Sequence, residues 1–274
     1  MGKKQYWNSE AKNARWIKEG RGQGSGKNYK PWLTVRDVAS EGRSHRIFGH
    51  LTKRTHHLLS DLELATFLLL QWRQSTEDIR EQFPLDPEVT KQICRSSGIS
   101  HPSHSGAVQY LSSDFVVSAK EKENPVFAIQ VKPVSKLASK RVIEKLEVER
   151  RYWLEKDIPW FLVTEKQIPR VVFNNIDWLY TLQQDVTYIE DECRNFEQHS
   201  KWLQEHGNLK IIDLCKQLDT AYSLPLGESL YQLRRMLAKR YFHFDITIPY
   251  TDLRCCDLYS ESVDSVVEVL NVSG

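Results

Sequence analysis

The sequence predicts an α/β fold, in which a mixed sheet flanked by helices is followed by a mainly helical C-terminal domain. Three observations support this prediction. Two apolar segments, 110–118 and 125–132, are separated by a charged turn. A long amphipathic segment, 136–156, leads into a short apolar run at 158–164. After about residue 168, helical patterns follow one another.

The first predicted helix spans 60–73, with the sequence SDLELATFLLLQWR. Ser60 and Glu63 have the spacing of a capping box, and strong helix formers follow them. The segment 98–106, GISHPSHSG, is rich in turn-forming residues and is predicted to be a loop. The helix therefore precedes the predicted sheet in the chain.

Residues 110–132 predict a β-hairpin, because the turn AKEKEN joins two segments with strand character. The helix expected at 136–156 then leads to a buried strand at 158–164, which we expect beside residues 128–132. A strand, a helix and a strand of this length form a βαβ unit.

The C-terminal part is predicted to contain helices at 171–183, 189–206, 209–222 and 227–240, the last of which runs into a strand of alternating apolar residues. Helices followed by a strand pair resemble a winged-helix module. Basic residues on the last helix could contact DNA or a protein; the acidic charge of residues 61–274 favours a protein. They are Arg234, Arg235, Lys239 and Arg240.

The predicted organisation has three parts. A basic N-terminal segment, 1–59, packs on or leads into a catalytic core at 60–168. A winged-helix-like domain at 169–274 serves partner contact, and the sequence leaves open whether it also touches DNA.

The composition excludes several classes of protein. With 40% hydrophobic and 27% charged residues, the chain is globular and not disordered. No run of about 18 apolar residues is present, so no membrane-spanning helix is expected, and the start MGKKQYWNSE lacks the apolar core of a secretory signal. Five cysteines without regular spacing argue against a disulfide framework and fit a reducing cytosol.

The net charge of +2 conceals an asymmetry along the chain. Residues 1–60 contain 13 Lys and Arg against 4 Asp and Glu, a net of +9, so the remainder carries −7. A basic front suggests contact with nucleic acid, although a solvated basic tail is an equal alternative. The glycine-rich loop 20–31 departs from the G-x-x-x-x-G-K-[ST] pattern, because Asn28 follows Lys27, but it suits an approach to DNA phosphates.

A candidate catalytic group lies on the predicted hairpin. Gln130 and Lys132 point to the same face because side chains alternate along a strand, and Asp114 on the adjacent strand can join them. Glu63 on the preceding helix could supply a second carboxylate, or it could simply cap its own helix. An acid followed by acid-x-Lys on a hairpin, with an acid from a preceding helix, is the layout of the restriction-endonuclease-like nucleases.

These residue types suit the hydrolysis of a phosphodiester with Mg²⁺, for which Mn²⁺ could substitute. In this hypothesis Asp114 anchors the metal and Glu63 completes its shell, while Gln130 and the backbone carbonyl of Val131 provide neutral oxygens. Lys132 orients the attacking water or offsets charge on phosphorus.

Gln130 departs from the usual motif, which has Glu or Asp at this position. The missing charge predicts weak metal binding until a DNA phosphate supplies another oxygen, and hence a nuclease that acts inside an assembly. A nuclease fold without activity is the alternative, against which the presence of Glu63, Asp114 and Lys132 argues.

Longer segments extend this match over much of the chain, and they resemble the TnsA family, the endonuclease subunit of a heteromeric cut-and-paste transposase of Tn-seven-like elements. The resemblance is strong from about residue 11 to residue 183 and recurs at 212–219. The matching segments include Arg-Gly-Gln-Gly (21–24), Pro-Trp-Leu-Thr-Val (31–35), Gly-Arg-Ser-His-Arg (42–46), Asp-Ile-Arg-Glu-Gln-Phe-Pro-Leu (78–85) and Gln-Val-Lys-Pro (130–133).

The resemblance implies a catalytic set of Glu63, Asp114, Gln130 and Lys132, in which the Gln is the family's own variation. It also implies cleavage at the 5′ ends of a transposon in the bacterial cytosol, with no membrane contact. The implied partners are transposon-end DNA, a TnsB-type integrase-fold transposase that cuts and joins the 3′ ends, and a TnsC-type ATP-using regulator that contacts the C-terminal part.

Other residues are candidates for supporting roles. Glu149 on the long helix could lie near the metal or on the solvated face of that helix. Contact with DNA is expected from several basic and histidine residues, although the two histidines could instead serve packing and Arg150 could instead pair with Glu147. They are Lys18, Arg21, Lys27, Arg43, His56, His57 and Arg150.

Two other functions compete with the transposase nuclease. One is a scaffold with a nuclease fold that positions or activates a partner without cutting. The other is a stand-alone nuclease for DNA repair or junction resolution, which would cut robustly without partners.

Overall fold

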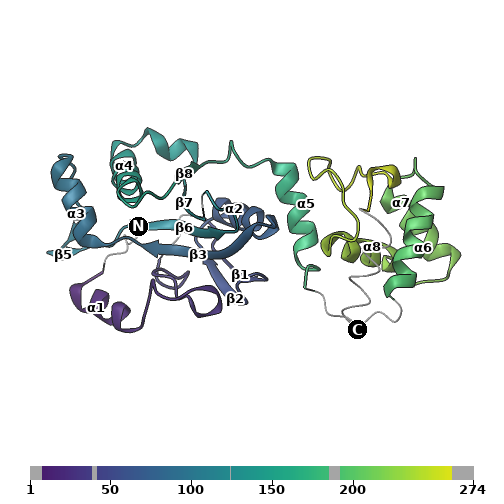
Figure 1. Cartoon of the computed structure of the whole chain (residues 1–274), viewed down its shortest axis with the longest axis horizontal. Helices are drawn as coiled ribbons and strands as arrows, with labels where there is room; N and C mark the ends of the chain where they lie inside the picture. Colours follow the sequence, from purple (N-terminus) through teal and green to yellow (C-terminus); the bar gives the residue numbers. More distant parts are fainter. Residues whose placement is uncertain (1–7, 39–41, 124, 185–191, 261–274) are drawn as a thin grey trace. The chain divides into compact units, whose positions relative to one another are not determined.

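The chain forms two compact units, Met1–Ile168 and Pro169–Gly274. The computed structural model describes residues 8–38, 42–123, 125–184 and 192–260 (Figure 1). Within these ranges, no helix combines the length and the apolar character needed to cross a membrane.

The first unit is built on a mixed sheet of four strands in the order β3-β6-β7-β8. The strands are β3 (Thr76–Pro84), β6 (Ser112–Ala119), β7 (Val126–Val131) and β8 (Trp160–Val163). β3 pairs antiparallel with β6, and β6 pairs antiparallel with β7, whereas β7 and β8 are parallel, with Ala128 opposite Trp160. The predicted hairpin and the predicted βαβ unit are both present, which confirms the α/β fold class.

The helix expected at 136–156 is divided in two. A 3₁₀ turn at Val134–Ala138 is followed by α4 (Lys140–Leu154), because Ser139 between them adopts an extended conformation, φ −84° and ψ 119°. In Figure 1, α4 covers one side of the sheet and α1 (Glu10–Lys18) lies on the other.

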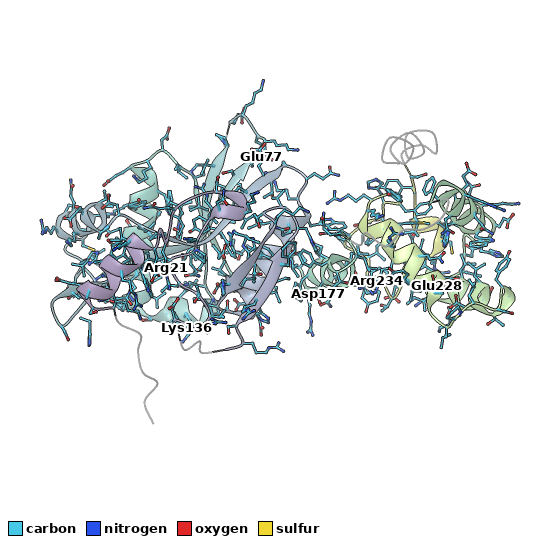
Figure 2. The ribbon with its side chains drawn as sticks, turned by 90° about the horizontal axis from the view of Figure 1, so that it is seen from below. Arg21, Glu77, Lys136, Asp177, Glu228 and Arg234 are labelled. Carbon is cyan, nitrogen blue, oxygen red and sulfur yellow. The ribbon has the colours of Figure 1, made fainter. Side chains whose placement is uncertain are left out.

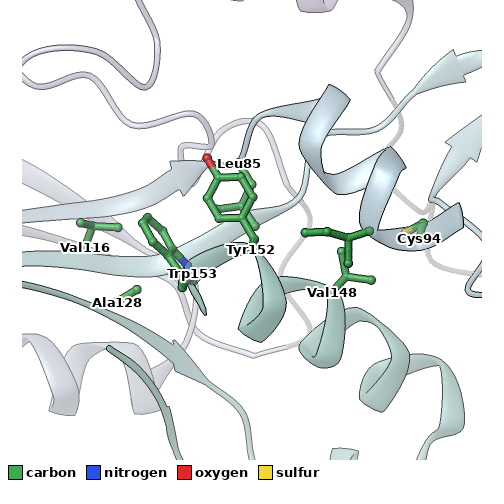
Figure 3. Packing of buried hydrophobic residues seen from close by; sticks show 8 residues of the cluster. Leu85, Cys94, Val116, Ala128, Val148, Tyr152 and Trp153 are labelled. Atoms are coloured by element: carbon green, nitrogen blue, oxygen red, sulfur yellow. The ribbon is translucent and has the colours of Figure 1, made fainter. Parts of the chain in front are cut away.

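A hydrophobic core fills the space between α4, the sheet and α3 (Pro87–Ser96) (Figure 3). Val148 and Trp153 of α4 pack with Val116 and Ala128 of the two central strands. Each of these side chains is at most 3% exposed. Burial of such side chains contributes about 1.5–3 kcal/mol for each large aliphatic group, so this core holds α4 against the strands that carry the candidate site.

The N-terminal segment is part of the first unit. After α1 come a 3₁₀ turn at Gly26–Asn28 and the hairpin of β1 (His45–Gly49) and β2 (Arg54–Leu58), and then α2 (Asp61–Trp72). Trp16 and Trp32 are buried edge to face, with their ring centroids 5.1 Å apart. The hydroxyl of Tyr29 donates to the carbonyl of Glu81 on β3. These contacts fix the basic segment to the sheet.

Part of the predicted loop 98–106 is a small hairpin of β4 (Ser103–His104) and β5 (Ala107–Val108). Ser105 and Gly106 between the strands have φ values of 49° and 80°, the left-handed backbone of a tight two-residue turn. The loop prediction was therefore wrong for these residues.

The second unit is mainly helical, as predicted. It contains α5 (Arg170–Tyr180), α6 (Glu192–Glu205), α7 (Ile211–Ala221) and α8 (Glu228–Ala238), and a 3₁₀ turn at Cys255–Asp257. Residues 189–191, the start of one predicted helix, lie outside the described residues. The side chain of Arg234 on α8 donates to the carbonyl of Trp178 and to the hydroxyl of Thr181, so this arginine joins α8 to the end of α5 (Figure 2).

The strand expected after α8 is not formed in the described part of this unit. Two isolated bridges, Lys210 with Arg254 and His243 with Tyr259, stand in place of a strand pair. Asp245 accepts hydrogen bonds from the amide and the hydroxyl of Thr247, which closes a turn inside the segment that was expected to be extended. The described residues of this unit thus form the predicted helices, but they do not form the paired strands that would make the wing of a winged-helix domain.

Candidate active site

Asp114 lies in the middle of the sheet, between two glutamines on the neighbouring strands. Phe115, the residue after Asp114, pairs with Glu81 of β3 and with Ile129 of β7. This register brings Gln82 and Gln130, the next residues along those strands, to either side of Asp114. The side chains of all three residues are buried, at 5% exposed or less. The strand register therefore determines the centre of the site.

Two groups from the end of β7 hold the Asp114 carboxylate. Its Oδ2 accepts a hydrogen bond of 2.8 Å from the amide of Val131 and lies 3.3 Å from the Lys132 ammonium. The Gln130 side-chain oxygen accepts from the amide of Asp114 at 3.0 Å. The structure thus brings together Asp114, Gln130 and Lys132, as the alternation along the strand predicted.

Glu63 caps its helix and also belongs to the site. Its amide donates to the Ser60 hydroxyl at 3.1 Å, and its carboxylate accepts from that hydroxyl at 3.0 Å and from the amide of Leu59 at 2.9 Å. The same carboxylate faces Asp114 across the side chain of Gln82. The capping role is therefore present, and its geometry leaves the carboxylate beside Asp114, where the alternative role as a second site carboxylate is also open to it.

Gln82 is the site residue that the sequence did not reveal. Its Nε2 lies 3.3 Å from Glu63 Oε2 and 3.2 Å from Asp114 Oδ1, so it donates to both carboxylates. The sequence signal that could have revealed Gln82 is the segment 78–85, which resembles the family. Because this segment carries polar residues at buried positions, its pattern does not indicate a central strand.

The charges of these groups depend on one another. Burial and, after it, the negative charge of Asp114 raise the pKa of Glu63 well above its ordinary value. Burial lowers the pKa of Lys132, but the carboxylates around it, with Asp114 first, outweigh that effect and raise it. The site therefore keeps Lys132 positively charged and disfavours two ionised carboxylates in the absence of a cation.

Glu149 of α4 lies in a separate buried cluster that includes Ser113, the residue before Asp114. Its Oε1 accepts from the Ser113 hydroxyl at 2.6 Å and from the Trp160 indole at 3.0 Å. The indole of Trp153 donates to the same Ser113 hydroxyl at 2.8 Å. Burial raises the pKa of Glu149 to about 8. Glu149 therefore contacts Ser113, which precedes Asp114 in the chain, and does not lie on the solvated face of the helix.

The oxygen atoms of the site suit a hard divalent cation. Glu63 and Asp114 provide two carboxylates in a water-poor place, Gln130 provides an amide oxygen, and Val131 provides a carbonyl that now accepts from Lys132 at 2.8 Å. Across the described ranges, no three His, Cys, Asp or Glu side chains come together as a group. An ion at this place would therefore need neutral oxygens beside the two carboxylates, and Gln130 and Val131 are the residues that could supply them.

Comparison with known proteins identifies the family of the chain. The family model "TnsA-like endonuclease N terminal" matches residues 73–165, and "TnsA endonuclease C terminal" matches residues 167–246. The chain is 49% identical over 265 residues to the transposon Tn7 transposition protein TnsA of Escherichia coli, covering 97% of each chain. The chain belongs to the TnsA family. Membership confirms the family predicted from the sequence, and with it an endonuclease subunit of a transposase.

Some of the residues expected to touch DNA hold this TnsA-family chain together. His56 is fully buried, with Nδ1 2.8 Å from Glu81 and Nε2 2.6 Å from the Thr52 hydroxyl, so it has no surface to offer DNA. Arg43 pairs with Asp61 at the start of α2, and Arg150 pairs with Glu147 one turn earlier on α4. Both arginines remain accessible at the surface.

The other expected DNA contacts lie on or near the surface of the N-terminal segment. Lys18 ends α1 and Lys27 lies in the 3₁₀ turn, and both are exposed. Arg21, labelled beside α1 in Figure 2, donates to the Trp32 carbonyl at 3.0 Å and to Asp37 at 2.7 Å. His57 is half-buried on β2, and burial lowers its pKa.

A basic hollow of about 440 Å³ lies on this surface. Arg36 and Arg46 are exposed there, and neither has an ion-pair partner in the part of the chain that the structure describes. Arg46 is paired with His57 across the β1–β2 hairpin. The lining residues are Arg21, Thr34, Arg36, Asp37, Arg46, Thr55 and His57.

Proposed function

We propose that this chain is a Mg²⁺-dependent endonuclease that cuts DNA at the 5′ ends of a transposon during excision, by attack of an activated water on the phosphodiester. The observation that carries the proposal is the position of Asp114. Its carboxylate is fixed by the amide of Val131 and faces Glu63 across Gln82, with the Lys132 ammonium beside it.

Each residue has a role that its contacts prepare. Asp114 and Glu63 would bind the ion, together with the side-chain oxygen of Gln130 and the carbonyl of Val131. When bound, Mg²⁺ supplies a Lewis acid and a water of lowered pKa. Mn²⁺ has a similar preference for oxygen and would substitute.

Lys132 contributes positive charge at the reacting phosphate. Its side chain is 31% exposed, so its ammonium reaches the open edge of the site while it contacts Asp114 and the Val131 carbonyl. The raised pKa keeps it protonated at neutral pH. A fixed ammonium in this place offsets the charge that builds up on the phosphoryl oxygens.

The DNA path proposed here follows the basic surface of the N-terminal segment. Lys18, Lys27 and the basic hollow with Arg36 and Arg46 offer cations that pair with no carboxylate among the residues that the structure describes. Arg43 and Arg150 sit at the surface in ion pairs that a phosphate could replace. Contacts to phosphate position the duplex and do not read its bases.

We further propose that the chain acts in the bacterial cytosol with two protein partners: a TnsB-type transposase at the 3′ ends and a TnsC-type regulator at the second unit. Support for a protein contact comes from the segment between α7 and α8. Tyr222, Leu224 and Leu226 there are 54%, 38% and 91% exposed. Apolar side chains gathered on one surface segment are typical of a protein interface.

A strand-specific assay tests the proposed function. The purified chain, its TnsB-type partner and its regulator are incubated with end-labelled transposon DNA and Mg²⁺. Asp114→Asn should abolish cuts at the 5′ ends and leave 3′ cutting by the partner intact. Wild-type protein that supports only 3′ cuts would indicate a scaffold, and robust cutting by the chain alone would indicate a stand-alone nuclease.

A further inference from the structure

Gln82 occupies a place that one side chain rarely has, between two carboxylates of a candidate catalytic site. Its Nε2 donates to Glu63 at 3.3 Å and to Asp114 at 3.2 Å. Its Oε1 accepts from the Ser112 hydroxyl at 3.3 Å, and its backbone carbonyl accepts from the amide of Trp32 at 3.1 Å. The residue is 2% exposed, so water cannot replace these contacts.

The partners fix the direction of the amide. Glu63 Oε2, which also accepts from the amide of Leu59, and Asp114 Oδ1 both act as acceptors here, so the group between them is the donor Nε2, and the Ser112 hydroxyl then serves Oε1. The backbone of Gln82 has φ 48°, in the left-handed region, and costs about 1–3 kcal/mol for a residue with a side chain. The fold therefore holds this side chain in place at some expense of backbone strain.

The position of Nε2 conflicts with a bound cation. Mg²⁺ lies about 2.0–2.1 Å from its oxygen ligands. A cation held by Glu63 and Asp114 would compete with the amide nitrogen of Gln82, which lies within hydrogen-bond distance of both carboxyl groups.

We propose that Gln82 is a neutral clasp that holds Glu63 and Asp114 together in the metal-free chain and is displaced when the divalent cation enters. The clasp preserves the arrangement of the two carboxylates without a charge. Its cost is a weaker affinity for the metal, because the cation must break both hydrogen bonds. The inference rests on the proposed function, since it assigns the metal to these two carboxylates.

Calorimetric titration with Mn²⁺ tests the clasp without relying on cleavage. Gln82→Leu keeps a similar volume but cannot donate. It should lower the melting temperature of the metal-free protein, tighten the Mn²⁺ dissociation constant about tenfold, and increase the stabilisation produced by saturating Mn²⁺. Unchanged or weaker binding would overturn the clasp, and weaker binding would identify Gln82 as a ligand.

Matched variants separate the possible causes. Gln109 is also a buried glutamine of the first unit, but it bonds the backbone of Asn8 and Ala107. Gln109→Leu should lower stability and leave Mn²⁺ affinity unchanged. If Gln82→Leu does not fold, Gln82→Asn, whose shorter side chain cannot span the two carboxylates, should show the same tightening, and unchanged affinity would again overturn the clasp. Binding that persists in Asp114→Asn would refute the metal site itself, a result distinct from failure of the clasp.

Discussion

The guanidinium of Arg54 on β2 lies against the fully buried carboxylate of Glu81 on β3. Nη1 of Arg54 donates to Oε1 at 2.7 Å, Nη2 contacts Oε2, and Nη2 also donates to the carbonyl of Ile79 at 2.8 Å. His56 contacts the same carboxylate at 2.8 Å. This group joins the β1–β2 hairpin to the strand that carries Gln82, one residue after Glu81.

Removal of one partner should destabilise the first unit strongly. Arg54→Ala leaves the Glu81 charge buried without its main cation, so we expect a loss of about 3–5 kcal/mol of unfolding free energy, measured by urea denaturation. Arg43→Ala is the control, because its ion pair with Asp61 is exposed. Equal effects of the two variants would show that the buried pair does not anchor the hairpin.

The Glu81 carboxylate should also give the protein part of its acid sensitivity. Burial alone would raise its pKa, but His56 and Arg54 lower the pKa of Glu81 to about 2. Because the folded value lies below the ordinary 4.5, the stabilisation is complete above about pH 5 and is lost as the pH falls toward 2. The difference in unfolding free energy between wild type and Glu81→Gln should therefore be constant near neutrality and shrink below pH 4.5; a difference that does not change with pH would contradict this.

Glu149 should have the opposite effect on stability. Burial raises its pKa to about 8, so the folded state holds a proton that the unfolded state releases near 4.5. The metal-free protein should lose stability as the pH rises from 4.5 to 8, by at most about 1.4 kcal/mol per pH unit from this group. Glu149→Gln keeps an oxygen for Ser113 and Trp160 and should show a flatter profile in EDTA. Parallel profiles would mean that Glu149 is ionised throughout.

The sequence predicted the catalytic strands because their signal is local. Apolar residues surround Asp114 on β6 and Gln130 on β7, and the alternation of side chains placed them with Lys132. The capping-box spacing of Ser60 and Glu63 predicted the start of the helix that carries Glu63. The fold of the family then followed from segments spread along the chain.

Strand β3 escaped prediction because its buried positions, apart from Ile79, are polar. Glu81 and Gln82 look like surface residues until Arg54 and Glu63, distant in sequence, are placed against them. Strand propensity does not identify a strand whose buried side chains are mostly polar and are held by hydrogen bonds and ion pairs. For His56 the structure decides between the two alternatives in favour of packing, and its partner Glu81, 25 residues away, could not be found from a local pattern.

Lys132 should be required for the proposed cleavage and not for the fold. Lys132→Ala removes the cation beside the reacting phosphate, and the rate of 5′ cleavage in the assembled transposase should fall about 10²–10³-fold. Lys136→Ala, in the exposed turn that follows β7 and labelled in Figure 2, should leave the rate within a factor of about two. A Lys132 variant that cuts at the wild-type rate would remove this residue from the mechanism.

The basic hollow should contribute to DNA affinity through charge. Each phosphate contact releases counterions, so the logarithm of affinity for duplex DNA falls with the logarithm of salt by about 0.9 per contact. The double variant Arg36→Ala and Arg46→Ala should bind a transposon-end duplex more weakly and reduce this slope by about 1.8, the amount for two contacts. Lys216→Ala, an exposed residue on α7, should leave the slope unchanged. If the double variant keeps the wild-type slope, the two arginines do not contact phosphate, and the path of the DNA must follow Lys18 and Lys27 without the hollow.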